Sequence, residues 1–388
     1  MKVLIVNRYM GIYGGAETVV KELAGRLNNL GIKNLILTLN ISEEVKNICT
    51  GLDIVTPEKN FPYKFRSTDL LSSLGIFGEI KHLRQLVKKH AAGYDLINVH
   101  NFPANWVAAG LGKPVAWMCN EVPDFYNSPR PSLSINLLRA AGIGVDRAIV
   151  NRSIDTICVA DEFNAQKVIR RYGRIPEIVP YGIEYDFFAD TGAQDFEIIR
   201  KNILENSFLL LQVGMLSPEK NQLKSIQAVE QLKSEIPNIA LLLAGKGGNP
   251  YEEMLKEYIR RQKLQKYIIF TGHLSKAQIR ALYYGCKIAL FPVKTQGGWL
   301  APFEALCAGK PIITSSSMGA ASIVKKENLG IVSDDLVKAI KDINHNYDFY
   351  AKIAQRAKGW VKDNLSWNLF TEKMLGVFEK TLSDWRRR

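Results

Sequence analysis

Short apolar runs alternate with amphipathic segments along most of the chain. The runs are almost unbroken by polar residues, which is typical of strands buried on both faces of a parallel sheet. Between them, apolar residues recur at three- and four-residue spacing, as in the segment from Ala16 to Asn29, and indicate helices. We expect strands at residues 2–6, 33–39, 95–100, 114–119, 154–160, 208–213, 239–244, 268–271, 288–291 and 311–314. This alternation predicts an α/β protein with doubly wound parallel sheets.

The alternation breaks once, in a polar and aperiodic passage near Glu184–Asn206, and then starts again. A chain of 388 residues is long for one domain and sufficient for two. We therefore expect two α/β domains with a boundary near residue 186, and helices at 336–343, 349–364 and 368–385. Ligands of doubly wound sheets bind at the carboxyl ends of the strands, so we expect the domains to face a central cleft that holds the ligand.

Composition narrows the class of protein. The apolar fraction of 47% fills two cores and excludes a disordered chain. The five cysteines are odd in number and scattered, which predicts reduced thiols in the cytoplasm and no structural zinc site. No apolar run is long enough for a membrane span or a signal-peptide core, so we expect a protein that is soluble or lies on a membrane surface. The net charge of +13 can attract nucleotide phosphates or anionic lipid, or can serve solubility alone. No nucleic-acid-binding motif accompanies it.

One segment, Lys59–His90, holds seven Lys or Arg residues against two acidic residues, mixed with many apolar side chains. A basic amphipathic stretch of this kind can lie in the interface of an anionic membrane. The alternative is a solvated loop and helix whose apolar side packs into its own domain.

The segment Lys294–Gly309 is the richest candidate for a binding site. It follows the apolar run at 288–291, passes through two glycines, and becomes helical in pattern. A strand, a glycine turn and a helix start present backbone N–H groups that attract anions. Glu304, in the helix, is suited to accept hydrogen bonds from the vicinal hydroxyls of a ribose or another sugar. An ordinary βα turn with a glycine hinge is the alternative.

Other glycine-rich turns also follow predicted strands. Gly14 and Gly15 precede the first helix, where glycine allows close approach to a phosphate and the helix start favours negative charge by roughly 0.3–1 kcal/mol. Gly214 opens a loop that ends at Lys220, a suitable position for a cation that contacts a diphosphate. Ala244–Gly248 is a further glycine-rich loop. On its own, the pair Gly14 and Gly15 is more often just a turn, and it lacks the Gly-x-Gly-x-x-Gly pattern of dinucleotide-binding enzymes. A lone lysine such as Lys220 is more often solvated.

Taken in order, these pieces resemble the family 4 glycosyltransferases, which have the GT-B fold. The resemblance covers nearly the whole chain and is carried by residues 14–17, 179–187, 213–220, 244–248, 268–272 and 296–309. It implies a Rossmann-like acceptor domain at 1–185, a Rossmann-like donor domain at 186–364, and a C-terminal helix at 365–388 that packs back on the first domain. It also implies a retaining transfer of a hexose from a UDP- or GDP-sugar, a co-substrate and not a cofactor, to a glycan or lipid-linked acceptor. The expected location is the cytoplasm, including the cytoplasmic face of the membrane.

The same resemblance implies roles for individual residues. Gly14 and Gly15 would face the donor diphosphate, and Lys220, in the loop from Gly214, would contact the same phosphates. Glu304 would take the ribose hydroxyls. His100, at the end of a predicted strand, would approach the donor sugar. The backbone that lines the sugar and phosphates would come from Gly297, Gly298, Trp299, Leu300 and Ala301. The candidate catalytic residues are His100, Gln296 and Lys220.

Two departures from the family pattern leave alternatives open. Gln296 stands where the family has the first of two glutamates, and a neutral hydrogen bond of about 0.5–1.5 kcal/mol replaces a charge-assisted one of about 1.5–3 kcal/mol. Met215 replaces a usual arginine, for which Lys294 and Arg8 are candidate substitutes. Both departures motivate the first alternative, a nucleotide-sugar-binding pseudoenzyme. The second alternative is a sugar-nucleotide epimerase, which would have a similar two-domain fold. No Asp-x-Asp occurs, so no metal is expected.

Overall fold

The protein divides into two compact units, and we describe each by itself. The computed structural model describes residues 1–11, 14–58, 61, 70–123, 133–190, 208–248, 250–294 and 299–388. Unit 1 comprises Met1–Tyr181 together with Trp367–Arg388, and unit 2 comprises Gly182–Ser366. The chain thus leaves unit 1 after Tyr181, four residues before the domain end expected at 185, and returns to it at Trp367 for its last helix.

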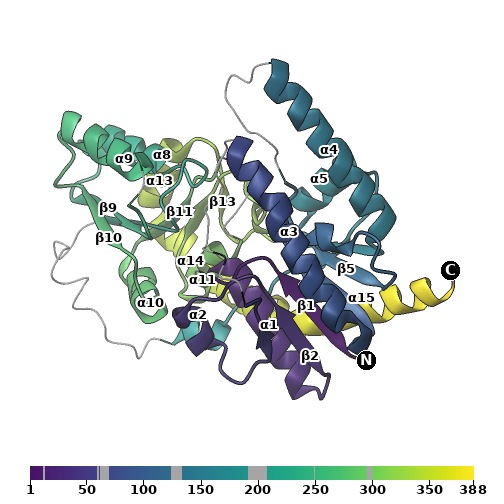
Figure 1. The fold of residues 1–388 in the computed structure, drawn as a ribbon. Helices are drawn as coiled ribbons and strands as arrows, with labels where there is room; N and C mark the ends of the chain where they lie inside the picture. Colours follow the sequence, from purple (N-terminus) through teal and green to yellow (C-terminus); the bar gives the residue numbers. More distant parts are fainter. Residues whose placement is uncertain are drawn as a thin grey trace. The chain divides into compact units, whose positions relative to one another are not determined.

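Unit 1 is a seven-stranded parallel sheet in the order β3-β2-β1-β4-β5-β6-β7. Figure 1 labels β1, β2 and β5 of this sheet. Its strands are β1 (Val3–Asn7), β2 (Asn34–Leu37), β3 (Ile54–Val55), β4 (Leu96–His100), β5 (Val115–Met118), β6 (Thr156–Val159) and β7 (Glu177–Ile178). Its helices are α1 (Gly15–Asn29), α2 (Glu43–Ile48), α3 (Leu70–His90), α4 (Leu133–Ser153), α5 (Glu162–Tyr172) and α15 (Trp367–Arg386), with short 3-10 helices η1 (Ala91–Gly93) and η2 (Ala104–Ala108). The β1–β4 pair is the switch point from which the sheet grows in both directions.

Unit 2 is a six-stranded parallel sheet in the order β10-β9-β8-β11-β12-β13, with its switch point between β8 and β11. Its strands are β8 (Phe208–Val213), β9 (Ile239–Ala244), β10 (Ile268–Gly272), β11 (Ile288–Phe291), β12 (Ile312–Thr314) and β13 (Ile331–Val332). Its helices are α6 (Tyr185–Ala189), α8 (Gln222–Leu232), α9 (Pro250–Arg261), α10 (Lys276–Gly285), α11 (Leu300–Cys307), α12 (Ala321–Lys326), α13 (Leu336–His345) and α14 (Tyr347–Asn364). The expected fold class, two doubly wound α/β domains, is confirmed.

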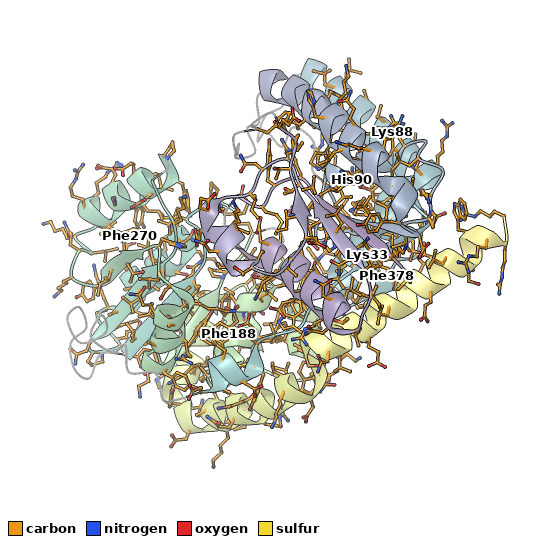
Figure 2. The ribbon with its side chains drawn as sticks, turned by 60° about the horizontal axis from the view of Figure 1, so that its bottom comes forward. Lys33, Lys88, His90, Phe188, Phe270 and Phe378 are labelled. Atoms are coloured by element: carbon orange, nitrogen blue, oxygen red, sulfur yellow. The ribbon has the colours of Figure 1, made fainter. Side chains whose placement is uncertain are left out.

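Each sheet is buried because apolar side chains occupy both of its faces. All residues of β1, β9 and β11 are buried, which accounts for the unbroken apolar runs in the sequence. Helix α1 buries the expected face, which consists of Val19, Val20, Leu23, Ala24 and Leu27. Figure 2 labels Phe378 and Phe188, whose side chains are buried in units 1 and 2 respectively. Among the described residues, no helix combines the length and the apolar character needed to cross a bilayer.

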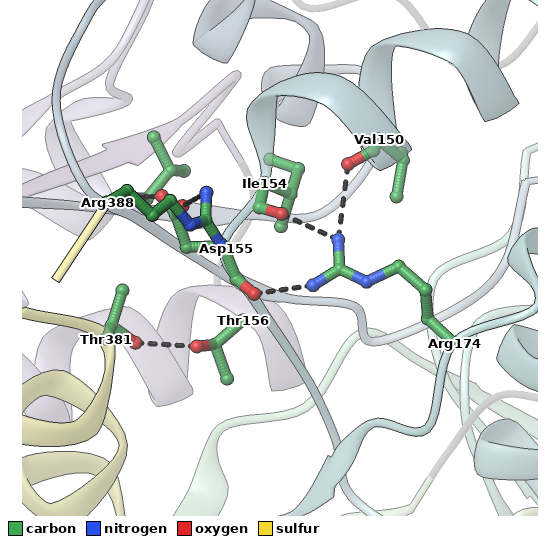
Figure 3. A network of polar contacts seen from close by, with 8 residues as sticks. Val150, Ile154, Asp155, Thr156, Arg174, Thr381 and Arg388 are labelled. Carbon is green, nitrogen blue, oxygen red and sulfur yellow. Dashed lines mark hydrogen bonds and ion pairs between the residues drawn. The ribbon is translucent and has the colours of Figure 1, made fainter. Parts of the chain in front are cut away.

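Helix α15 is attached to unit 1 by polar contacts at the start of β6 (Figure 3). The hydroxyls of Thr381 and Thr156 lie 2.7 Å apart, and the Arg388 guanidinium lies 2.8 Å from a carboxylate oxygen of Asp155. The same turn is held by Arg174, which donates to the Ile154 carbonyl at 2.6 Å. The last helix is therefore part of the first unit, although residues 182–366 separate the two in sequence.

We expect Phe378→Ala, in α15, to lower the free energy of unfolding by about 3–5 kcal/mol, because a fully buried ring is lost and a cavity remains. The matched control is Phe349→Ala in α14, where the ring is 61% exposed and a change within about 0.5 kcal/mol is expected. Urea denaturation followed by circular dichroism measures both. Equal effects of the two substitutions would contradict the packing described for α15.

Candidate functional site

In unit 2, the loop after β8 carries Lys220 to the switch point. Gly214 leaves the strand at φ 144°, a region that favours glycine, and its amide donates to the Ala244 carbonyl at 2.8 Å. The loop then turns, and the Lys220 amide donates to the Ser217 carbonyl at 3.1 Å. The aliphatic part of Lys220 lies along Gly214, since a Cβ on this glycine would meet Lys220 Cδ at 3.7 Å. The lysine is thus held at the carboxyl end of β8, where the sequence analysis expected it.

Two buried glutamines hold the β8–α8 loop, and the sequence analysis did not single them out. Gln212 donates to the Lys220 carbonyl at 2.7 Å and accepts from the Ser225 hydroxyl at 2.7 Å. Gln222, which is fully buried, donates to the Met215 carbonyl at 3.1 Å. A buried amide needs hydrogen-bond partners. The glutamine inside the apolar run Phe208–Val213 is therefore the feature of the sequence that could have indicated this role.

The loop after β11 is joined to the loop after β8. The Lys294 amide donates to the Glu219 carbonyl at 2.9 Å, and the Asn221 side chain donates to the Pro292 carbonyl at 3.0 Å. Lys294 is exposed beside the Lys220 loop, which keeps it a candidate for the missing family arginine. Met215, at the position of that arginine, is 40% exposed.

The predicted site residues Gln296, Gly297 and Gly298 lie outside the described residues. The structure resumes at Trp299, whose ring is 7% exposed and packs on Phe303 with the ring centres 4.7 Å apart. The side chain of Trp299 is therefore part of the buried interior of unit 2. Leu300 and Ala301, in the first turn of α11, are half-buried.

Glu304 is half-buried on α11 beside the hydroxyl of Tyr283. This hydroxyl lies 3.1 Å from the Ala301 carbonyl oxygen and 3.4 Å from a Glu304 carboxylate oxygen. Desolvation raises the pKa of Glu304 to about 7, and the positive charge of Lys276 opposes the rise. Lys276 is itself paired with Glu184 at 2.5 Å. Near pH 7 the Glu304 carboxyl group is thus divided between its acid and carboxylate forms, and ligand hydroxyls that donate to it would favour the carboxylate.

In unit 1, Gly14 and Gly15 lie at the start of α1, after β1. Gly14 is extended, with φ −147°, and its carbonyl accepts from the Thr18 amide at 3.0 Å and the Thr18 hydroxyl at 2.8 Å. The backbone conformation of Gly14 does not itself require glycine, so the absence of a side chain is the property that would suit a ligand. Glu17, in the first turn, is half-buried, and desolvation raises its pKa to about 7.

His100 is fully buried at the end of β4, the strand that pairs with β1 at the switch point of unit 1. Its Nε2 lies 2.7 Å from Asn98 Oδ1, and burial lowers the pKa of the imidazole to about 3. Asparagine side chains at the ends of the neighbouring strands are linked to one another by hydrogen bonds. Asn101 donates to Asn7 at 3.2 Å, and Asn120 donates to Asn101.

Arg8, the second candidate for the missing arginine, is held within unit 1 by an ion pair. Its Nε donates to the Glu79 carboxylate at 2.8 Å, and its guanidinium lies 4.7 Å from the centre of the Tyr9 ring. Glu79 is 7% exposed and comes from α3. A guanidinium that is engaged by a buried carboxylate is less available to a ligand phosphate, so Lys294 is the better candidate.

Two family models match the chain and together span most of it. The model described as Glycosyltransferase Family 4 matches residues 13–187, and the model described as Glycosyl transferases group 1 matches residues 194–360. A GDP-mannose-dependent alpha-(1-6)-phosphatidylinositol monomannoside mannosyltransferase of Mycobacterium tuberculosis is 21% identical over 247 residues, which are 59% of this chain and 64% of that protein.

Solved structures similar to the protein share its whole fold. Anabaena Alr3699/HepE, in complex with UDP and glucose, has a TM-score of 0.79 and 18% identity over 98% of this chain and 100% of its own. Sucrose-phosphate synthase from Thermosynechococcus elongatus has a TM-score of 0.79 and 16% identity over 99% of each chain. These likenesses establish the GT-B architecture of the two units.

We expect Gly245→Ala to destabilise unit 2, because the added Cβ would lie 2.0 Å from the Gly214 carbonyl oxygen and force the loops after β8 and β9 apart. Overpacking of this kind costs roughly 1–3 kcal/mol. The control, Gly359→Ala in α14, meets no atom within 4 Å and should add about 0.5–1 kcal/mol of stability. Denaturant unfolding measures both, and a neutral Gly245→Ala would contradict the close approach of the two loops.

Proposed function

Because the chain belongs to the family 4 glycosyltransferases, we propose that it transfers a hexose from a nucleotide-sugar donor to a glycan or lipid-linked acceptor, with retention at the anomeric carbon. One observation carries the proposal. In unit 2, the loops after β8 and β11 are bonded to each other and hold Lys220 and the Glu304 helix at the same edge of the sheet. A cation for a diphosphate and a carboxylate for a pentose are what a nucleotide-sugar site requires.

The proposed chemistry consists of positioning and electrostatic stabilisation of the departing diphosphate. In unit 2, Lys220 would meet the phosphate charge without a metal ion. In unit 1, the backbone N–H groups near Gly14 and Gly15 are the groups suited to a phosphate. Glu304 would hold the ribose through its two hydroxyls. The similarity to HepE, solved with UDP and glucose, and to a GDP-mannose-dependent mannosyltransferase supports a UDP- or GDP-hexose as donor.

Met215 favours one alternative, a protein that binds the nucleotide-sugar without transferring it. Its thioether cannot replace the charge of an arginine at a phosphate, so donor binding could persist while stabilisation of the leaving group is lost. Thermal-shift screening with UDP- and GDP-hexoses identifies the donor, because a ligand that binds the folded state raises its melting temperature. Incubation of that donor with glycan and lipid-linked acceptors then decides: transfer with retained configuration supports the enzyme, and a tight complex without transfer supports the alternative.

We expect the affinity for the nucleotide-sugar to rise with pH between about 6 and 8 as Glu304, with its pKa of about 7, becomes a carboxylate that accepts the ribose hydroxyls more strongly. A nucleotide-sugar is the appropriate probe because it carries no terminal phosphate that titrates in this range. Calorimetric titration at several pH values measures the slope.

In Glu304→Gln the affinity should fall and lose this pH dependence. The contribution of Glu304 to the stability of the unliganded protein changes with pH in the opposite direction to the donor affinity. Because the pKa of Glu304 is raised in the folded state, the wild type loses stability as the pH rises from the unfolded value of 4.5 until the loss levels off above pH 7. Compared with the wild type, Glu304→Gln should therefore be more stable at pH 8 than at pH 5. A variant that binds the donor like the wild type would refute the role of Glu304.

We also propose that unit 1 docks on an anionic membrane, as predicted for the segment Lys59–His90. Of this segment the structure describes residue 61 and residues 70–90. On α3, Lys81, Lys88 and Lys89 are exposed, whereas the acidic Glu79 is buried against Arg8. Figure 2 labels Lys88 and His90 near the end of this helix.

Helix α4 lies beside α3 (Figure 1), and residues of both helices line one groove. A groove of about 390 Å³ lies between α3 and α4 and is lined by Phe77, Ile80, Trp106, Val145 and Ile149, with Lys81, Arg84 and Lys88 among its other residues. Phe77 is 57% exposed, and on α4 Leu137 is 64% exposed. The acidic residue of α4, Asp146, is fully buried, where it accepts from Trp106 at 2.7 Å and Tyr172 at 2.6 Å.

Among the described side chains of α3 and α4, every exposed charge is therefore positive, and exposed apolar side chains lie between these charges. Apolar side chains that enter the interface, surrounded by cations that meet anionic headgroups, are the combination that supports docking on such a membrane. A lipid-linked acceptor would be reached from this surface.

We expect the double variant Lys81→Glu/Lys88→Glu to bind anionic vesicles roughly 30-fold more weakly or worse, because each basic residue near such a surface contributes about 1 kcal/mol. The control, Lys325→Glu/Lys326→Glu, makes the same change of net charge on exposed lysines of α12 and should bind like the wild type. Flotation with vesicles that contain phosphatidylserine, and with neutral vesicles, measures the effect at low salt. Equal loss in both variants, or no binding by the wild type, would overturn the assignment of this surface.

A further inference from the structure

We propose that Asn98 is a positioning residue that selects the tautomer of His100, so that Nε2 carries the proton and Nδ1 is a hydrogen-bond acceptor. Asn98 and His100 stand two residues apart on β4 and therefore on the same face of the sheet. Both side chains are fully buried. Of the two residues, only His100 is a candidate from the sequence, because a histidine suggests chemistry and an asparagine in an apolar run does not.

The neighbouring strand determines the orientation of the Asn98 amide. Asn98 pairs with Ala116 of β5, and its Nδ2 donates to the Ala116 carbonyl at 3.1 Å. The opposite orientation would place two acceptor oxygens at this distance and leave both without a proton. Oδ1 must then face His100, where it lies 2.7 Å from Nε2.

This contact decides where the imidazole carries its proton. An amide oxygen accepts hydrogen bonds and cannot donate, so Nε2 must be the protonated nitrogen. Burial keeps the ring neutral, with a pKa of about 3, and a neutral imidazole has only one N–H. Nδ1 is therefore an acceptor, and it is buried with no hydrogen-bond partner in the described part of the chain.

A buried acceptor without a partner is costly, and a ligand that donates to it recovers that cost. His100 ends β4 at the switch point of unit 1, where ligands of doubly wound sheets bind. Under the proposed function, the complementary group is a hydroxyl of the donor sugar. His100 then acts as a neutral acceptor that orients the sugar, and neither as a proton donor nor as a cation for the phosphates. This last step rests on the proposed function, whereas the tautomer does not.

Nitrogen-15 NMR of the full chain labelled at its five histidines tests the tautomer directly. The His100 signal is the one missing from the spectrum of His100→Gln. We expect a neutral ring with Nε2–H in the wild type across pH 6–9. An Nδ1–H tautomer or an imidazolium in that range would overturn the proposal, even if no Asn98 variant folds.

Variants test whether Asn98 is the cause. In Asn98→Leu we expect the Nδ1–H form to appear and kcat/KM for the donor found by thermal shift to fall roughly tenfold or more, as when the orienting partner of a histidine is lost. Asn34→Leu is the matched control: Asn34 is also a buried asparagine of this sheet, on β2, and its loss should leave the tautomer unchanged. Nε2–H as the sole form in Asn98→Leu, as in the wild type, would refute the role of Asn98. The expected tautomers in a protein that binds no nucleotide-sugar would instead refute the proposed function alone.

Discussion

Parallel pairing of strands that are distant in sequence is the constraint on which the candidate residues of each unit depend. In unit 2, β8 pairs with β9 on one side and with β11 on the other, so the segments after β8 and β11 leave the same edge of the sheet. In unit 1, β1 and β4 stand in the same relation. The candidate residues lie at the ends of these strands or in the segments that follow them, at a switch point where diverging connections leave room for a ligand.

The loops at these switch points are held by buried polar side chains that belong to the strands and helices beneath them. Gln212 and Gln222 bond the backbone of the Lys220 loop, and Asn98 bonds the ring of His100. Such groups are tolerated inside an apolar core only when their hydrogen bonds are made. The hydrogen bonds that satisfy these buried amides also restrict the loop and the ring to which the amides are bonded.

Desolvation shifts the pKa values of Glu304 and His100 in opposite directions. It raises the pKa of Glu304 to about 7 and lowers that of His100 to about 3, because burial disfavours the charged form of each. Without ligand, the glutamate is therefore only partly charged near pH 7 and the histidine is uncharged. A ligand rich in hydroxyl groups suits both side chains, since hydroxyls donate to a carboxylate and to a neutral imidazole nitrogen alike.

Periodicity and local chemistry were enough to predict most of the elements. The strands Phe208–Val213, Ile239–Ala244 and Ile288–Phe291 have the expected bounds, and the helical segment expected from Ala16 to Asn29 is observed from Gly15 to Asn29. The two-residue strands β3, β7 and β13 were not predicted, because two residues carry no periodicity. These successes concern residues that are neighbours in the chain, whose pattern records which face of an element is buried.

The sequence by itself therefore determined the fold class, the glycine-rich loops and the candidates Lys220, His100 and Glu304. Only the tertiary structure decided which strands pair, that Gln212 and Asn98 support the candidate residues, and that Arg8 is engaged by Glu79. It also decided the protonation of Glu304 and His100. The physical reason is that strand order, hydrogen bonds between distant segments and desolvation arise from packing, which no local pattern of residues encodes.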